Sequence, residues 1–147
     1  MEYAHTQWGF LVIPTFILFA VVIPIIAADD ETTVAITVML IVFTIALLAI
    51  VLLFSRLEIT VRDGRIVAAF GFGRPHREIE LADVTTVRQV RNTWIQGWGI
   101  RKISGGWMYN VWGLDAVEVD LSSGDVFRIG TDDPENLLAA ISLQIKR

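Results

Sequence analysis

Two long uncharged apolar runs limit what this chain can fold into more than any other feature. Residues 8–28 and residues 32–54 contain no Asp, Glu, Lys or Arg. At 1.5 Å per residue, a helix of either length crosses a hydrocarbon core of about 30 Å. We therefore predict an N-terminal transmembrane hairpin over residues 1–55, whose two helices are connected by the short acidic segment 29–31.

The distribution of charge predicts the side of the membrane on which the rest of the chain lies. All twelve Lys and Arg residues lie at or after Arg56, and no basic residue flanks the acidic connection. Because basic residues flank the cytoplasmic ends of membrane helices, we expect a multi-pass protein of the inner (cytoplasmic) membrane with both termini in the cytoplasm. Trp8 and Arg56 are the expected anchors at the membrane interface. A cleaved signal peptide is the alternative for the first run, but Glu2 stands where such a peptide carries basic residues.

Residues 56–147 are predicted to form a separate cytoplasmic domain that consists mainly of strands. Apolar and polar residues alternate in 57–62 and 66–70, on either side of Asp63-Gly64, which is typical of a β-hairpin. Four further runs are predicted as strands: 76–81, 84–90, 116–121 and 125–130. Pro134 begins an amphipathic pattern with Asp132 or Asp133 as the N-cap, which predicts a C-terminal helix.

About seven short strands followed by one helix is the order of a pleckstrin-homology-like (PH-like) barrel. The segments GWGIR, GGWMYNVWGLDAVEVDL and FRIGTDDPENL make the chain resemble the bacterial PH-like membrane proteins over nearly its whole length. The resemblance implies an α-helical transmembrane hairpin plus a mainly β PH-like barrel closed by one C-terminal helix. It implies no activity. Phosphoinositide binding is not expected, because the first hairpin offers only Arg62 and Arg65 beside Asp63.

The remaining motifs favour structural roles over chemistry. The chain has no cysteine, which excludes thiolate ligands and cysteine nucleophiles. His5 and His76 lack evident carboxylate companions, Glu118 and Asp120 are expected on one solvated strand face, and 71–75 is expected to be a turn. We therefore predict a non-enzymatic protein without a catalytic residue, metal or cofactor. Twelve basic and twelve acidic residues in 56–147 argue against nucleic-acid binding.

The segment 91–110, RNTWIQGWGIRKISGGWMYN, is the strongest candidate for a binding surface. Its glycines predict an exposed, bent loop rather than a helix. The candidate contact residues in and beside it are Arg88, Arg91, Trp94, Trp98, Arg101 and Lys102. Tryptophan prefers the headgroup region, and each basic residue near an anionic leaflet contributes about 1 kcal/mol. Trp107 and Trp112 are instead expected to pack in the core of the barrel or to close its open end.

Two functions follow from this pattern and stay open at the level of sequence. The first is a membrane adaptor or scaffold whose cytoplasmic domain engages a membrane protein partner or a second copy of itself, because exposed aromatics beside arginine are typical of protein interfaces. The alternative is a membrane-surface sensor that binds anionic lipid of the bilayer through the Trp/Arg loop 88–107.

Overall fold

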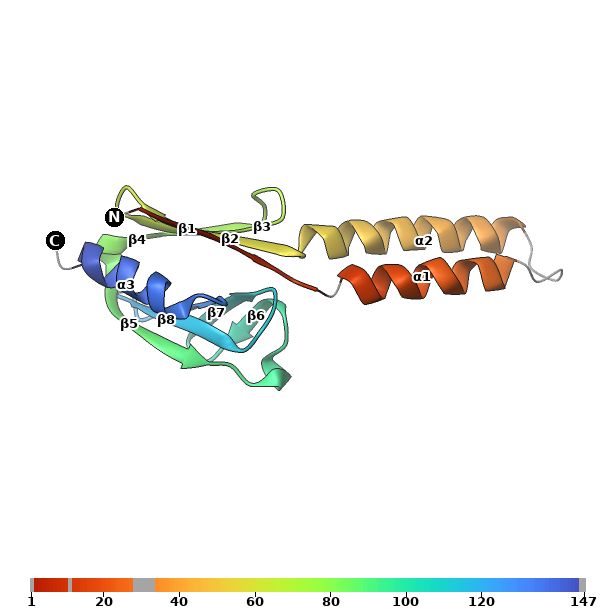
Figure 1. Ribbon diagram of the computed structural model, residues 1–147. Helices are drawn as coiled ribbons and strands as arrows, with labels where there is room; N and C mark the ends of the chain where they lie inside the picture. Colours follow the sequence, from red (N-terminus) through yellow and green to blue (C-terminus); the bar gives the residue numbers. More distant parts are fainter. Residues whose placement is uncertain (1, 11, 28–33, 146–147) are drawn as a thin grey trace.

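The computed structural model describes residues 2–10, 12–27 and 34–145, which form a two-sheet body with a pair of helices extending from one end (Figure 1). The predicted acidic connection 29–31 lies outside the described residues. The elements in chain order are β1 (Tyr3–Trp8), α1 (Val12–Ala27), α2 (Val34–Leu53), β2 (Arg56–Arg62), β3 (Arg65–Phe70), β4 (His76–Glu80), the 3-10 helix η1 (Leu81–Asp83), β5 (Val84–Arg91), the 3-10 helix η2 (Trp94–Gln96), β6 (Gly99–Ile103), β7 (Gly106–Asn110), β8 (Asp115–Leu121), β9 (Val126–Gly130) and α3 (Pro134–Ile145).

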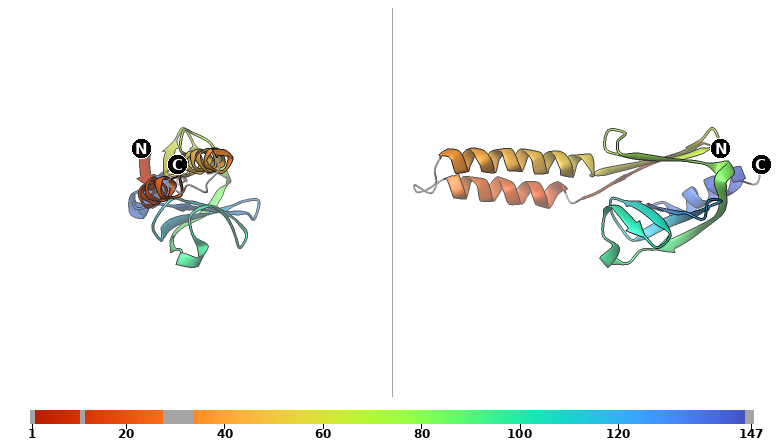
Figure 2. Two further views of the ribbon diagram at one scale, coloured as in Figure 1. Left: turned by 90° about the vertical axis from the view of Figure 1, so that its right-hand side faces the viewer. Right: turned by 180° about the vertical axis from the view of Figure 1, so that it is seen from behind.

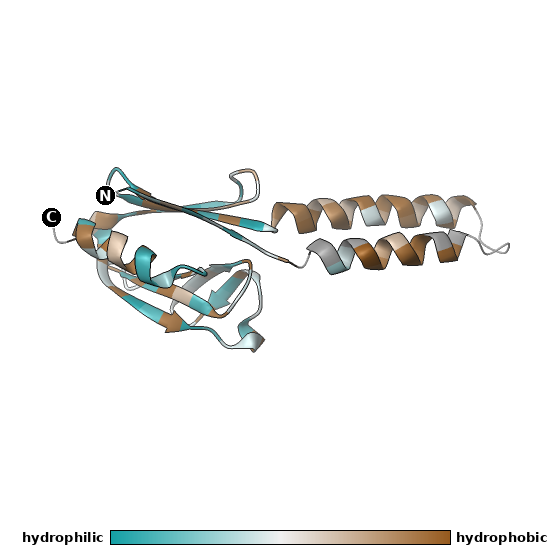
Figure 3. Ribbon diagram, viewed as in Figure 1, coloured by the Kyte–Doolittle hydropathy of each residue, from teal (hydrophilic) through white to brown (hydrophobic). Residues whose placement is uncertain are grey.

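Helices α1 and α2 lie side by side and run in opposite directions, as both figures show (Figures 1 and 2). Both are almost entirely apolar (Figure 3). Helix α2 has 20 residues, none of them buried, and it is long and apolar enough to cross a membrane. Helix α1 has 16 residues. The first predicted span is wrong at its start, because Trp8 ends β1 and the backbone N–H of Gly9 donates to the Ser55 carbonyl at 2.6 Å.

Sheet A consists of β1, β2, β3 and β4 in that order, and each neighbouring pair is antiparallel. Strand β1 was not expected from the sequence. It pairs with β2 from Tyr3 opposite Val61 to Trp8 opposite Arg56. The chain therefore leaves sheet A after β1, passes through both helices, and returns to the same sheet in β2.

The predicted β2–β3 hairpin is confirmed. Leu57, Ile59 and Val61 are fully buried, as the alternation of the sequence requires. At the reversal, Asp63 and Gly64 both have positive φ, 51° and 75°, which is the conformation of a type I′ turn.

Sheet B has the order β5-β8-β9-β7-β6, in which only the β7–β9 pair is parallel. The prediction of a loop over 91–110 is wrong for its second half, where β6 and β7 form an antiparallel hairpin. Gly106 in this hairpin allows a close approach of two strands. A Cβ on Gly106 would lie 1.6 Å from the Val126 carbonyl oxygen of the neighbouring β9, so only glycine fits there.

The core lies between the inner faces of the two sheets, and α3 packs over it with Leu137, Ala140 and Ile141 buried. The helix begins at Pro134, as predicted. The expected closed barrel is not present, because no ladder joins a described strand of sheet A to one of sheet B. The fold is thus a mixed α/β arrangement of two separate sheets and three helices.

Two neighbouring phenylalanines test this description of the core. Phe70 is fully buried and contacts the rings of Phe54 and Tyr109, each at a centroid distance of 5.1 Å, whereas Phe72 is 89% exposed. We expect Phe70→Ala to lower the free energy of unfolding by about 3–5 kcal/mol, measured by chemical denaturation of the full chain in detergent micelles. Phe72→Ala is the matched control and should change it by less than about 0.5 kcal/mol. Equal losses in both variants would contradict the assignment.

Candidate membrane-contact site

Aromatic side chains gather where the two helices leave the sheets. The ring of Trp98, just before β6, stacks on Trp112 with centroids 5.3 Å apart and planes 9° apart. Trp112 in turn meets the edge of Phe10, which precedes α1, at 6.0 Å. This row of rings connects sheet B to the base of α1. Aromatic rings at the end of an apolar helix are typical of a membrane–water interface.

Both predicted interface anchors, Trp8 and Arg56, lie at this junction. They are paired across β1 and β2, and the Arg56 guanidinium carbon lies 5.7 Å from the centroid of the Trp8 ring, a cation–π contact. Arg56 also donates from Nη2 and Nε to the Gly71 carbonyl, at 2.7 and 3.2 Å. The pair therefore joins β1, β2 and the β3–β4 turn directly beneath α2.

Two turns at the same end of the body carry large exposed apolar side chains. Phe72 in the β3–β4 turn, Trp94 and Ile95 are 89%, 78% and 76% exposed. Figures 1 and 2 show the β3–β4 turn and the segment around η2 at the end from which the helices extend. The η2 turn is held by a capping box in which Thr93 and Gln96 bond each other's backbone. Exposed apolar groups presented on short, fixed turns indicate a contact surface.

Four of the six predicted contact residues fall within this region. Trp94 is exposed on η2, and Trp98 is 39% exposed beside its stacking partner. Arg101 lies in β6 and donates from Nε to the Trp98 carbonyl at 3.2 Å, and Lys102 follows it with an exposed side chain. Phe72, Ile95 and Phe10 were missed by the sequence analysis, although Phe72 between two glycines is the kind of apolar turn residue that signals exposure.

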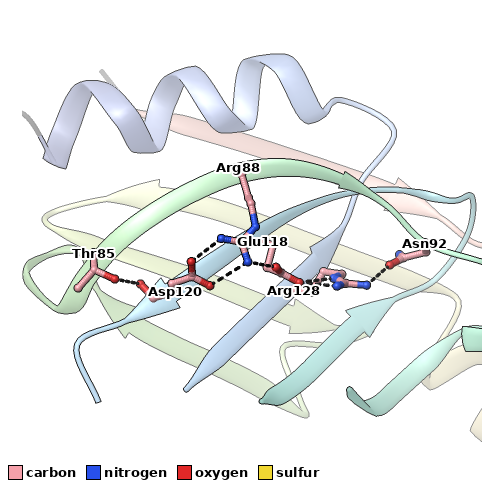
Figure 4. Close-up of polar contacts among 6 residues, drawn as sticks. All are labelled: Thr85, Arg88, Asn92, Glu118, Asp120 and Arg128. Atoms are coloured by element: carbon pink, nitrogen blue, oxygen red, sulfur yellow. Dashed lines mark hydrogen bonds and ion pairs between the residues drawn. The ribbon is translucent and has the colours of Figure 1, made fainter. Parts of the chain in front are cut away.

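Arg88 and Arg91 belong to strand β5, and Arg91 ends that strand three residues before Trp94. Arg88 donates to Glu118 and, at 2.5 Å, to Asp120 of the adjacent β8 (Figure 4). These hydrogen bonds, first to Asp120 and then to Glu118, raise the pKa of the Arg88 guanidinium. Arg91 lies 3.9 Å from Asp115 at the end of the same pair of strands. Arg88 therefore supports sheet B, whereas Arg91 is 73% exposed and stays a predicted contact residue.

The expectation of a solvated carboxylate face on β8 is wrong for Glu118, which is only 5% exposed. Arg128 of β9 donates to Glu118 from Nε at 2.7 Å and from Nη2 at 2.5 Å. The same guanidinium donates to Asn92 at 2.9 Å, so the cluster runs across β5, β8 and β9 (Figure 4). Glu118 is buried because long arginine side chains from the strands on both sides lie over it.

The N-terminal strand brings a second polar contact that the sequence did not indicate. His5 Nε2 lies 2.6 Å from Asp132, contrary to the expectation that this histidine has no carboxylate companion. Nearby, the Tyr3 hydroxyl donates to Asp133 at 3.3 Å. Burial of the hydroxyl, and to a smaller extent the negative charge of Asp133, raises its pKa. The prediction failed because β1 itself was not expected. Within the described ranges, no group of three or more His, Cys, Asp or Glu is placed to hold a metal.

Comparison with models of known protein families and with curated proteins gives no match to this chain. The class of protein is therefore defined by the structure alone: a β-rich body joined without a linker to a helix that can cross a membrane. Its candidate functional surface is the aromatic and basic end next to that helix.

The buried cluster gives a prediction for stability. We expect Glu118→Gln to lower the free energy of unfolding by about 3 kcal/mol, because it leaves the 17% exposed Arg128 without its charged partner. Glu78→Gln is the control, since Glu78 pairs at 2.7 Å with the well-exposed Arg65 and should contribute less than about 1 kcal/mol. Both are measured by chemical denaturation in micelles. A loss at Glu118 no larger than that at Glu78 would show that the cluster is not buried.

Proposed function

We propose that the chain is a non-enzymatic, multi-pass protein of the inner membrane whose β-sheet body is docked on the cytoplasmic leaflet and binds anionic lipid. The observation that carries this proposal is the position of the exposed Phe72, Trp94 and Ile95 at the end of the body beside the apolar helices. Membrane helices hold that end close to the headgroups. Apolar groups exposed there are covered once the turns enter the leaflet.

The β1–β2 ladder supports a transmembrane hairpin. Two hydrogen-bonded strands of one sheet lie on the same side of a membrane, so the chain that connects them crosses an even number of times. If α2 is one crossing, the segment between β1 and α2 supplies the other, and α1 is the uncharged helix in that segment. Its 16 residues extend about 24 Å.

Charge supports the cytoplasmic orientation. Every Lys and Arg lies in the part of the chain that begins at Arg56, and Arg56 itself is packed at the base of α2. The positive-inside rule then places the body, and with it both termini, in the cytoplasm. Over the described residues, nine short strands in two sheets with the helix α3 over the core also support a PH-like architecture in an open form.

Lipid binding is supported by the basic residues beside the exposed turns. Arg101 and Lys102 are both exposed, and they lie three and four residues after Trp98, whose ring stacks on Trp112. Each contributes about 1 kcal/mol next to an anionic leaflet. Peripheral segments bind membranes by burying apolar side chains and by electrostatic attraction to anionic lipids. Here Trp94 and Ile95 supply the apolar side chains, and Arg101 and Lys102 supply the positive charge.

The absence of native cysteine allows a direct test of docking. We expect a spin label on Ile95→Cys of the full chain to be more accessible to oxygen than to a polar relaxation agent in bilayers that contain phosphatidylglycerol, because Ile95 enters the leaflet. The matched control is Ser123→Cys in the β8–β9 turn, which lies beside η1 at the far end of the body and should report water. Electron paramagnetic resonance measures both.

Pure phosphatidylcholine bilayers provide the second comparison. If anionic lipid drives docking, the label on Ile95→Cys becomes more accessible to the polar agent when phosphatidylglycerol is removed. A label that reports water in both bilayers would mean that the turns do not enter the membrane. A label equally buried in both would contradict the requirement for anionic lipid and leave apolar docking alone.

An adaptor that engages a membrane protein partner or a second copy of the chain is the second candidate function. It is favoured by the opening between the edge strands β4 and β6, where a cavity of about 220 Å³ is lined by Arg77, Ile100, Trp107 and Tyr109. Trp107 is 45% exposed there, and the Arg77 guanidinium carbon lies 5.6 Å from the centroid of the buried Phe127 ring. Tryptophan and arginine side by side at a strand edge are typical of interface hot spots.

A photo-crosslinking residue in place of Trp107 tests this candidate in native membranes. We expect one discrete adduct of higher mass, at twice the chain mass if the partner is a second copy. The same residue in place of Ser123, at the opposite end, should give none. Products that do not differ between the two positions would contradict a partner at this opening.

A further inference from the structure

We infer that a cavity between the end of α2 and the start of β6 is a binding site for one anionic phospholipid. The cavity has a volume of about 370 Å³, within the range of small-molecule sites. The inference deepens the proposed function and rests on it in one respect, namely that α2 crosses the membrane with its last turn at the interface.

The walls of the cavity come from both halves of the molecule. Ile50, Val51 and Phe54 belong to the last turn of α2 and the residue after it, and Trp98 and Ile100 face them from sheet B. Gly9 and Gly99 also line the cavity and contribute no side chain, and Ser55 and Val111 complete the lining. A side chain on Gly99 would meet no atom within 4 Å, so glycine here leaves the space open. The surface offered to a ligand is therefore mainly apolar.

Arg101 is the one charged residue among those that line the cavity. Its Nε donates to the Trp98 carbonyl at 3.2 Å, and its side chain packs 3.5 Å from the position of a Cβ on Gly97. Over the described part of the chain it makes no ion pair, unlike Arg88 and Arg128. The guanidinium is thus held in place while its two Nη groups remain for a ligand. That fork matches the oxygens of a phosphate.

These features together identify the occupant. No residue of α2 is buried, so an acyl chain can pass from the hydrocarbon along the helix to Ile50 and Val51 without meeting water. The phosphate of the same lipid then lies at the level of Arg101. A cationic headgroup would require a carboxylate, and none lines the cavity. Charge complementarity therefore favours a lipid with a net negative headgroup, such as phosphatidylglycerol, over phosphatidylcholine.

The test counts lipids bound to the full chain in detergent micelles by native mass spectrometry. The probes are phosphatidylglycerol and phosphatidylcholine, titrated separately. We expect one phosphatidylglycerol per chain, with weaker binding of phosphatidylcholine. Arg101→Gln should weaken phosphatidylglycerol binding about tenfold, since a charge-assisted contact is lost. Arg62→Gln removes the same charge from an exposed residue at the end of β2 away from α2, which does not line the cavity, and should weaken binding less than about twofold.

A third variant tests the apolar part of the site. Val51→Trp fills the cavity from the α2 side without changing any charge, and should abolish the one-to-one complex. Unchanged unfolding curves of all three variants in the same micelles establish that they are folded. Equal binding of the two lipids, equal effects at Arg101 and Arg62, or a complex that survives Val51→Trp would each overturn the site.

Failure of this site and failure of the proposed function are separable. Micelles present no bilayer surface, so the lipid count does not depend on insertion of the exposed turns. A buried label on Ile95→Cys without a one-to-one lipid complex would overturn the site and leave docking intact. The reverse result would retain the site and reject docking.

Discussion

The ladder between β1 and β2 is the interaction on which the rest of the structure depends. It holds both ends of the helical pair in one sheet, from Tyr3 opposite Val61 to Trp8 opposite Arg56. The bond from Gly9 to Ser55 closes the ladder beside α2. Under the same end, a Cβ on Gly71 would lie 2.4 Å from the Leu53 carbonyl oxygen, so the β3–β4 turn packs directly against the helix. Helices and sheets are consequently joined as one body.

The elements that could be predicted are those in which the regular spacing of apolar residues coincides with the buried face. The β2–β3 hairpin and α3 are such cases, because each has one apolar face and a clear turn or cap. Strand β1 could not be predicted, since YAHTQW shows no alternation and its partner lies about fifty residues away in the sequence. The β6–β7 hairpin was hidden by glycines that read as loop residues but serve the close approach of β7 to β9.

The candidate site was predicted in composition but not in arrangement. The exposure of Trp94 agrees with the prediction of a contact residue, and its neighbour Ile95 adds to the same surface. Arg88 appeared to belong to that surface because it is close in sequence. Its charge is satisfied by Glu118 and Asp120, which lie about thirty residues further along the chain. The pairing of Arg88 with these carboxylates depends on the register of β5 against β8. The register between strands that are distant in sequence cannot be derived from local periodicity.

The β1–β2 ladder also has a consequence for biogenesis. Strand β1 is synthesised before its partner β2, which follows only after both helices have been made. A chain inserted with a single crossing would strand β1 on the opposite side of the membrane and leave the edge of β2 unpaired. Exposed strand edges invite aggregation and degradation. Sheet A can therefore be completed only when β1 and β2 lie on the same side of any membrane that the helices cross.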